Sequence, residues 1–252
     1  MIRVLVNGCH GAMGQSVIEE ISKRQDVLVA CGVDRTPEKR ELAFNVYPRI
    51  QEIKEEIDLI IDFSHPFYLA DTLAYCTGHK VPIVMGTTGY TDEEKQKIEQ
   101  AAGYAPILYA ANTAIGVNLM EALVRKAALA FKDEVDIEII ERHHRTKKDA
   151  PSGTARMFVR AINESLNVSK KMQCGREGKE IERTEAEIGV HSIRGGQLDS
   201  DHTVLFACQD ETLEIHSNVR NLASFSKGAI YAGLQLVSYK PGLYKMSDLI
   251  QF

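Results

Sequence analysis

Short apolar runs alternate with helical stretches over the first 110 residues, and this alternation limits the possible folds more than any other feature of the chain. The apolar runs span residues 2–6, 27–33, 57–63, 81–85 and 106–110. Helical stretches, such as 67–77 and 92–102, lie between them. Continuous apolar strands separated by helices are typical of a parallel sheet that is covered on both faces. We therefore predict an α/β domain over residues 1–112.

The pattern changes after Asn112. Helical spacing of apolar residues predicts helices over 115–131 and near 153–166. Strand-like runs stand at 135–140, 187–193, 203–208 and 212–216. Few helices among many strands indicate a mixed or antiparallel sheet. We expect a domain boundary near 112–115, and a final helix at 223–238 that returns to the first domain.

Three glycines follow the first strand and open the first helix. They are Gly8, Gly11 and Gly14, and Asp34 ends the next strand, 20 residues after Gly14. Glycines at this point allow a pyrophosphate to approach the helix N-terminus, and an acidic residue after the second strand can bind a ribose. The pattern predicts a dinucleotide site. Arg35 stands beside Asp34 and would attract a 2′-phosphate, so the choice between NADH and NADPH stays open.

Two further turns follow predicted strands of the same sheet. They are Gly86-Thr87-Thr88-Gly89 and Ala110-Ala111-Asn112-Thr113. In an open parallel sheet, ligands bind outside the carboxyl ends of the strands. Small and hydroxyl side chains there suit a nicotinamide ring and its ribose, although each segment taken alone is also an ordinary turn sequence.

The densest polar cluster of the chain is ERHHRTKKD at 141–149, followed by Pro151-Ser152-Gly153-Thr154. Four fixed cations, two anions and two histidines stand together in a chain whose formal net charge is −5. The segment 151–154 predicts a helix start, whose free backbone N–H groups bind anions. We infer a pocket for an anionic small molecule such as a dicarboxylate.

Several classes of function are disfavoured. No carboxylate or cysteine stands at metal-ligand spacing from His143 or His144, so we expect no metal site. The overall negative charge and the short basic run, without interleaved aromatics, argue against nucleic-acid binding. No stretch approaches the ~18 apolar residues of a membrane span. Five scattered cysteines and the absence of a signal-like N-terminus predict a cytoplasmic protein.

At this point several segments together resemble a known family. They are GCHGAMG at 8–14, GTTG at 86–89, AANTAIGVNL at 110–119 and ERHHRTKKDAPSGTA at 141–155. The family is 4-hydroxy-tetrahydrodipicolinate reductase, also called dihydrodipicolinate reductase, of the diaminopimelate route to lysine. The resemblance runs nearly end to end and includes FSKGA at 225–229. The long pattern HHxxKxDAPSGT is specific, whereas the short glycine motifs are not.

The resemblance implies a Rossmann-like domain over 1–112, completed by 222–252, and a central α+β mixed-sheet domain over 113–221 that binds the substrate and forms a homotetramer. It implies NADH or NADPH as cofactor and a small dicarboxylate as substrate. His143 would be the proton donor and Lys147 the second catalytic residue. His144, Gly153 and Thr154 would bind the substrate carboxylates. The cofactor would be bound by Gly8, Cys9, His10, Gly11, Ala12, Met13, Asp34, Arg35, Gly86, Thr87, Thr88, Ala110, Ala111, Asn112 and Thr113.

The chain departs from the family pattern at three places. Thr113 stands where the family usually has an aromatic residue, and Arg220 lies five residues before Phe225 rather than three. Ser200-Asp201 precede His202 where the family has Gly-Glu. The departures at Thr113 and Arg220 bear on the affinity and preference for the cofactor.

Two other functions remain open from the sequence. One is another NAD(P)-dependent dehydrogenase acting on an amino-dicarboxylate, although no cysteine has the context of the nucleophile that a semialdehyde enzyme needs. The other is a catalytically silent nucleotide-sensing protein, which would be expected to lose His143 or Lys147. The roles of His191, Arg194 and His202 are also open, because a strand pair could bring them to the pocket.

Overall fold

The computed structural model describes residues 1–132 and 135–250. The chain divides into two units. The first contains Met1–Ile115 and the segment that starts at Leu222, and the second contains Gly116–Asn221. Among the described residues, no helix is long and apolar enough to cross a membrane.

The first unit is built on a seven-stranded sheet in the order β12-β6-β5-β4-β1-β2-β3. All of its neighbouring strands are parallel, as the apolar runs predict. The strands are β1 (Ile2–Asn7), β2 (Val27–Val33), β3 (Asn45–Tyr47), β4 (Leu59–Asp62), β5 (Ile83–Met85), β6 (Pro106–Tyr109) and β12 (Gly242–Tyr244).

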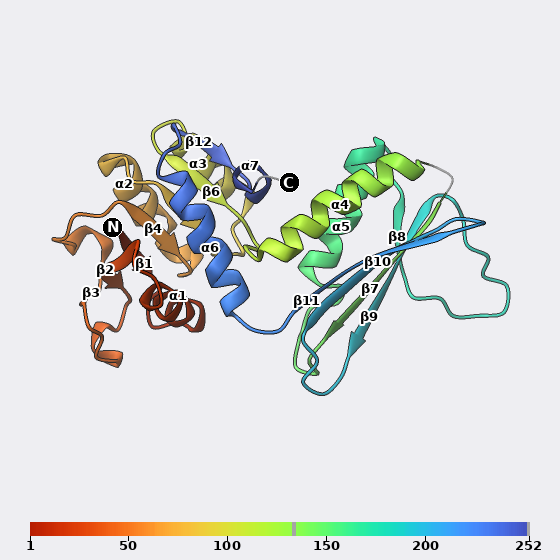
Figure 1. Cartoon of the computed structure of the whole chain (residues 1–252), viewed down its shortest axis with the longest axis horizontal. Coiled ribbons are helices and arrows are strands. Elements are labelled where there is room, and N and C mark those ends of the chain that lie inside the picture. Colours follow the sequence, from red (N-terminus) through yellow and green to blue (C-terminus); the bar gives the residue numbers. More distant parts are fainter. Residues whose placement is uncertain (133–134, 251–252) are drawn as a thin grey trace. The chain divides into compact units, whose positions relative to one another are not determined.

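Helices cover both faces of this sheet (Figure 1). They are α1 (Ala12–Ser22), α2 (Leu69–His79), α3 (Asp92–Ala101), α6 (Ala223–Leu236) and α7 (Met246–Leu249), with one-turn 3₁₀ helices at Pro37–Lys39, Ile50–Glu52 and Pro66–Tyr68. Successive strand residues supply opposite cores: Val4 packs in the cluster with α1 and α6, and Leu5 in the cluster with α2 and α3. Because side chains alternate along a strand, a sheet with two covered faces needs the uninterrupted apolar runs seen in the sequence.

The second unit contains a five-stranded sheet in the order β11-β10-β7-β9-β8. Its strands are β7 (Asp136–His143), β8 (Lys171–Cys174), β9 (Glu187–Arg194), β10 (Ser200–Ala207) and β11 (Thr212–Val219). Strand β10 is antiparallel to both neighbours, whereas β7, β9 and β8 are parallel. The predicted mixed sheet is confirmed.

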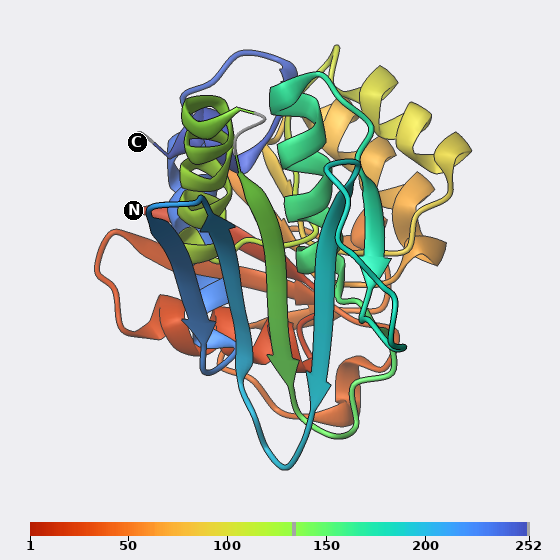
Figure 2. The ribbon, with the colours of Figure 1, turned by 90° about the vertical axis from the view of Figure 1, so that its right-hand side faces the viewer.

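Two helices, α4 (Ile115–Phe131) and α5 (Gly153–Leu166), lie on one face of this second sheet (Figure 2). On β7, Ile137, Ile139, Glu141 and His143 are all buried, while the residues between them are more exposed. The alternation puts these four side chains on the helix-covered face. The polar side chains of Glu141 and His143 thus continue the apolar row of Ile137 and Ile139 at the end of the strand.

Apart from the one-turn 3₁₀ helices, the described elements that the sequence did not predict are β3, β8, β12 and α7. Strands β3 and β12 have three residues each and α7 has four, too few to show a period. Strand β8 reads KMQC and lies at a sheet edge, where no apolar run is required. Strand β7 also extends to His143, beyond the expected end at residue 140.

Candidate active site

The glycine loop after β1 has the close packing that a dinucleotide turn requires. Gly8 has φ +81°, and a Cβ added at Gly14 would lie only 2.2 Å from the carbonyl oxygen of Gly8. Helix α1 starts at Ala12, and its N-cap residue Gly11 supplies no side-chain hydrogen bond. The first backbone N–H groups of a helix lack intrahelical partners, so this end of α1 can bind a phosphate. The residues present fit a dinucleotide.

Asp34 follows β2 and lies against the same loop. Its Oδ2 accepts a hydrogen bond from the backbone N–H of His10 at 3.1 Å. The side chain of His10 is buried, with Nε2 3.1 Å from the carbonyl oxygen of Pro37. Arg35 is exposed. The carboxylate is therefore fixed to the glycine loop, and the neighbouring guanidinium is free to meet solvent or a ligand.

A cavity of about 700 Å³ opens at the carboxyl ends of these strands. Of the residues predicted from the sequence, it is lined by Met13, Gly86, Thr87 and Thr88. It is also lined by residues that the sequence analysis did not assign to the cofactor: Phe63, Ser64, His65, Pro66, Gly89 and Glu94. Most of these follow β4, so the rule that ligands bind where parallel strands end could have identified them.

A buried carboxylate ties the loops of this cavity together. Asp62, at the end of β4, accepts hydrogen bonds from Asn7 Nδ2 at 2.7 Å, Ser64 Oγ at 2.6 Å and Thr87 Oγ1 at 2.8 Å. Burial raises the pKa of Asp62, and the hydrogen bonds oppose that rise. The carboxylate therefore fixes two loop residues, Ser64 and Thr87, that line the cavity.

The segment Ala110–Thr113 follows β6 at the same edge of the sheet. Asn112 Oδ1 accepts a hydrogen bond from the backbone N–H of Ala114 at 3.0 Å. Thr113 is 2% exposed, and its hydroxyl donates to the carbonyl oxygen of Phe225 at 2.8 Å. The Thr113 side chain thus links this loop to α6, a contact that the sequence pattern did not indicate.

In the second unit, a polar cluster centres on the carboxylate of Glu141. Both Nη atoms of Arg194 donate hydrogen bonds to this carboxylate, one to each oxygen, and each distance is 2.7 Å. The backbone N–H of Ser152 donates to Oε1 at 3.1 Å, and Nδ1 of His143 lies 2.5 Å from Oε2. Burial would raise the pKa of Glu141, but hydrogen bonds from Arg194, Ser192 and His143 outweigh it and lower the pKa to about 2. The carboxylate is ionised at neutral pH.

His143 lies between this carboxylate and a hydroxyl. Its Nε2 is 3.0 Å from Ser200 Oγ, on the neighbouring strand β10. Burial lowers the pKa of His143, and the charges of Lys147 and Arg194 act in the same direction, while Glu141 opposes them. The imidazole is buried, with 6% exposed. It is thus a titratable group with one nitrogen fixed by a carboxylate and the other at a hydroxyl.

His202 packs behind His143. Its ring centre is 5.2 Å from that of His143, and its Nε2 is 3.0 Å from Ser152 Oγ. Burial, together with the charge of His143, lowers the pKa of His202 to about 4. Ser152 also accepts a hydrogen bond from the backbone N–H of Ala155 at 3.1 Å and caps α5. The helix start predicted at 151–154 is confirmed.

The remaining predicted residues of this unit surround the helix start. Lys147 Nζ donates to Asp149 Oδ1 at 2.8 Å, and Nδ1 of the exposed His144 lies 2.7 Å from Thr146 Oγ1. Gly153 is the first residue of α5, and a Cβ added there would meet no atom within 4 Å. The helix end is therefore open to a ligand at Gly153, and an anion there would lie beside a basic loop.

The structure also decides among the three residues whose place the sequence left open. Arg194 and His202 belong to the cluster around His143. His191 does not, since its Nε2 lies 2.7 Å from Glu138, a side chain that alternates away from Glu141 on β7. Glu141 and Ser200 are the residues of the cluster that sequence analysis did not identify as functional.

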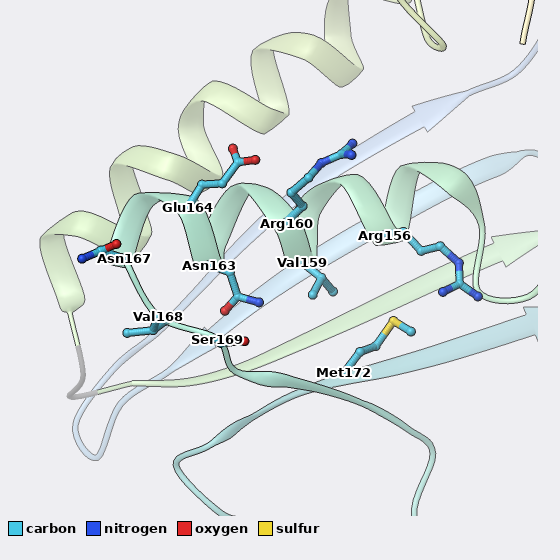
Figure 3. A pocket seen from close by; sticks show the side chains of 9 residues that line it. All are labelled: Arg156, Val159, Arg160, Asn163, Glu164, Asn167, Val168, Ser169 and Met172. Atoms are coloured by element: carbon cyan, nitrogen blue, oxygen red, sulfur yellow. The ribbon is translucent and has the colours of Figure 1, made fainter. Parts of the chain in front are cut away.

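A second cavity, of about 700 Å³, lies along the side of α5 between Arg156 and Met172 (Figure 3). None of the predicted site residues lines it. The side chains of Arg156 and Arg160 point in different directions (Figure 3). Glu164 pairs with Arg125 of α4 at 2.8 Å. The two arginines therefore do not converge on one ligand.

Comparison with known proteins matches both units to one family. Residues 2–113 match the family model described as dihydrodipicolinate reductase, N-terminus, and residues 116–250 match that described as dihydrodipicolinate reductase, C-terminus. The chain belongs to the dihydrodipicolinate reductase family. The resemblance drawn from the motifs is thereby confirmed.

Individual relatives of the family cover the whole chain. The 4-hydroxy-tetrahydrodipicolinate reductase of Caldanaerobacter subterraneus subsp. tengcongensis is 39% identical over 251 residues, which are 100% of this chain and 99% of the relative. That of Akkermansia muciniphila is also 39% identical, over 99% of this chain and 98% of the relative. Among solved structures, the dipicolinate-bound dihydrodipicolinate reductase of Paenisporosarcina sp. TG-14 matches with a TM-score of 0.83, 27% identity and 97% coverage of both chains.

Proposed function

We propose that this chain is a 4-hydroxy-tetrahydrodipicolinate reductase that uses NADH or NADPH in the synthesis of diaminopimelate and lysine. The observation that carries the proposal is the arrangement of segment 141–154. It holds a histidine with one fixed nitrogen, a lysine and an open helix N-terminus in one cluster. These groups suit a dicarboxylate whose reduction ends in a proton transfer. The two full-length relatives, from Caldanaerobacter subterraneus and Akkermansia muciniphila, are both named for this activity.

For the cofactor, we propose that the loop from Gly8 to Met13 and the start of α1 hold the pyrophosphate, and that Asp34 binds the adenosine ribose. The cavity lined by Gly86, Thr87 and Thr88 would accept the nicotinamide end. The bound nicotinamide supplies a hydride for the reduction. The protein residues bind and orient it, and the Asp62 network keeps the lining loops in place.

For the substrate, we propose that the N–H groups of Gly153 and Thr154, together with His144, bind the carboxylates. Charge-assisted hydrogen bonds of this kind are short and strong. Loss of water from the hydroxylated cyclic imine gives a conjugated double bond, and hydride addition to it leaves an enamine that needs a proton. His143 donates this proton, and Lys147 stabilises the anionic substrate and completes the catalytic pair.

We also propose a cytoplasmic homotetramer that assembles through the second unit. Helices α4 and α5 lie on one face of its sheet (Figure 2). The other face presents Ile140 and Leu205, which alternate with buried residues of their strands, and Ile193, which pairs with the exposed Arg142 of β7. Light scattering of the purified chain measures its mass, and a monomeric mass at micromolar concentration would contradict this part of the proposal. All five cysteines are free thiols, in keeping with a reducing compartment.

The activity is tested with substrate generated in place from pyruvate and aspartate semialdehyde by the upstream synthase. Loss of the absorbance of NADH or NADPH is followed separately for the wild type, His143→Ala and Lys147→Ala. The wild type should turn over, and each variant should lose at least ~100-fold in kcat. His79→Ala and Lys126→Ala are the matched controls, because both residues are exposed and lie outside the two sites.

The outcomes separate the alternatives. Folded wild-type chain that binds the nucleotide but turns over no substrate would exclude the reductase and favour a nucleotide-sensing protein. Turnover of another amino-dicarboxylate, and not of this substrate, would favour the other dehydrogenase. Variants at His143 and Lys147 that keep wild-type rates would refute the catalytic assignment while leaving the reaction itself in place.

A further inference from the structure

The carboxylate of Glu141 occupies an unusual position. The residue is 0% exposed and stands on the buried face of β7, in one row with Ile137 and Ile139. Removing an ionised carboxylate from water is strongly unfavourable unless donors replace the lost hydration. Apolar residues would fill this row at no such cost. The position of Glu141 therefore points to a role other than packing.

Several hydrogen bonds replace the lost hydration of this carboxylate. Arg194 donates two of them, and the backbone N–H of Ser152 donates another. Nδ1 of His143 lies 2.5 Å from Oε2. An ionised carboxylate can only accept hydrogen bonds. The hydrogen between Nδ1 of His143 and Glu141 must therefore sit on Nδ1.

The other imidazole nitrogen, Nε2, can take up and release a proton. Neutral imidazole carries one hydrogen, so Nε2 of His143 is an acceptor when the ring is neutral, and it receives the second proton when the ring is charged. Nε2 lies 3.0 Å from the hydroxyl of Ser200, which is partly exposed. Ser200 stands where the family pattern has a glycine, so this chain places a hydroxyl at the nitrogen that exchanges its proton.

We propose that Glu141 is the positioning residue of the catalytic histidine: its carboxylate, clamped by Arg194, holds the hydrogen of His143 on Nδ1 and leaves Nε2 to take up and deliver the proton of the reaction. Glu141 touches neither substrate nor cofactor in this scheme and acts through His143. The inference rests on the proposed function, because the proton in question is the one that completes the reduction.

The charges that face His143 come from every strand packed against it and from the loop that follows. They are Glu141 on β7, Arg194 on β9, His202 on β10 and Lys147 in the loop. Glu141 is the anion of this set, and its charge raises the pKa of His143, while the charges of Lys147 and Arg194 lower it. Removing the anion should therefore make His143 harder to protonate.

The test is nitrogen NMR of the ring nitrogens in protein labelled with ¹⁵N-histidine, with the His143 signals assigned from their loss in His143→Gln. In the wild type without ligands, above the pKa of His143, the hydrogen should be on Nδ1. In Glu141→Gln, the ring should titrate at lower pH than in the wild type, and the preference for Nδ1 should weaken. The matched control is Glu138→Gln. Glu138 lies on the same strand as Glu141 and also pairs with a histidine and with arginines, but it does not contact His143.

Steady-state kinetics gives a second readout. Glu141→Gln should lower kcat by at least ~10-fold and move the decline of kcat at high pH to lower pH, with KM values near those of the wild type. Glu141→Asp, which keeps the charge, should recover part of the rate, and Glu138→Gln should behave as the wild type. A merely structural loss would change none of the pH dependence.

Two results would overturn the proposal: a hydrogen on Nε2 in the neutral wild-type ring, or an unchanged His143 titration in Glu141→Gln. The first is observed on the wild-type ring itself and holds even where Glu141→Gln fails to fold. Failure of the proposed function is a separate result, because it appears as wild-type protein without turnover, while the NMR measurement on the ligand-free chain still decides the position of the hydrogen.

Discussion

Acid should lower the free energy of unfolding of this protein through His202. This contribution should disappear in His202→Gln. The residue is 1% exposed, and burial lowers its pKa from 6.5 to about 4. The unfolded chain therefore takes up this proton at a higher pH than the folded chain. The resulting stability is complete above pH 6.5 and is lost as the pH falls towards 4. At ~1.4 kcal/mol per pH unit, the whole loss is ~3 kcal/mol, of which ~2 kcal/mol is gone by pH 5.

The assay is urea denaturation followed by circular dichroism at pH 7 and pH 5, at one protein concentration. Glutamine places an uncharged amide near Ser152 Oγ, which bonds Nε2 of His202 in the wild type. The free energy of unfolding of the wild type should fall between the two pH values by ~2 kcal/mol more than that of His202→Gln. His79→Gln, at an exposed position, is the control and should follow the wild type. Equal pH dependence in the wild type and His202→Gln would refute the reasoning.

Four other substitutions test the packing and the proposed cofactor site. Gly14→Ala puts a Cβ where the Gly8 oxygen lies 2.2 Å away, so the loop must shift, and the Kd for NADH measured by calorimetry should rise at least ~10-fold. Phe158→Ala removes a fully buried ring of α5, and urea denaturation should show a loss of ~3 to 5 kcal/mol. Arg35→Ala should lower the ratio of kcat/KM for NADPH to that for NADH, and Asp34→Asn should raise it, because the first removes a positive charge and the second a negative charge beside a 2′-phosphate. A loss of stability below ~1 kcal/mol in Phe158→Ala would contradict the packing interpretation. An unchanged Kd in Gly14→Ala, or unchanged kcat/KM ratios in Arg35→Ala and Asp34→Asn, would contradict the cofactor-site interpretation.

Most of the first unit could be predicted because its sheet is covered on both faces. Two faces require apolar residues at successive positions, as at Val4 and Leu5, and such runs are visible in a single sequence. The helix start at Ser152 was also predictable, since capping depends on residues close together in the chain. Local signals of this kind identified the glycine loop as well.

The polar cluster around His143 was only partly predictable. Glu141 and His143 are two residues apart, but their partners Arg194 and Ser200 are 53 and 57 residues away in sequence. Their meeting depends on the register of β7 with β9 and β10, which pairs His143 with Arg194 and Arg142 with Asp201. Periodicity indicates the face of a strand but not its partner or its register. Sequence analysis therefore proposed a role for His143 but did not identify Glu141 as its partner.

The two buried carboxylates, Asp62 and Glu141, show how the donor set decides what such a group does. Each stands near the carboxyl end of a strand and accepts hydrogen bonds from loop residues. Asp62 has neutral donors, so burial prevails and its pKa rises, whereas the guanidinium of Arg194 helps to hold the pKa of Glu141 at about 2. Glu141 therefore brings a permanent negative charge to His143, and its replacement should change a proton equilibrium. Asp62 chiefly holds hydroxyl groups in place, so its replacement should change the shape of the cavity that Ser64 and Thr87 line. If this cavity binds the nucleotide as proposed, the replacement should change the affinity for the nucleotide and not the pH dependence of the reaction.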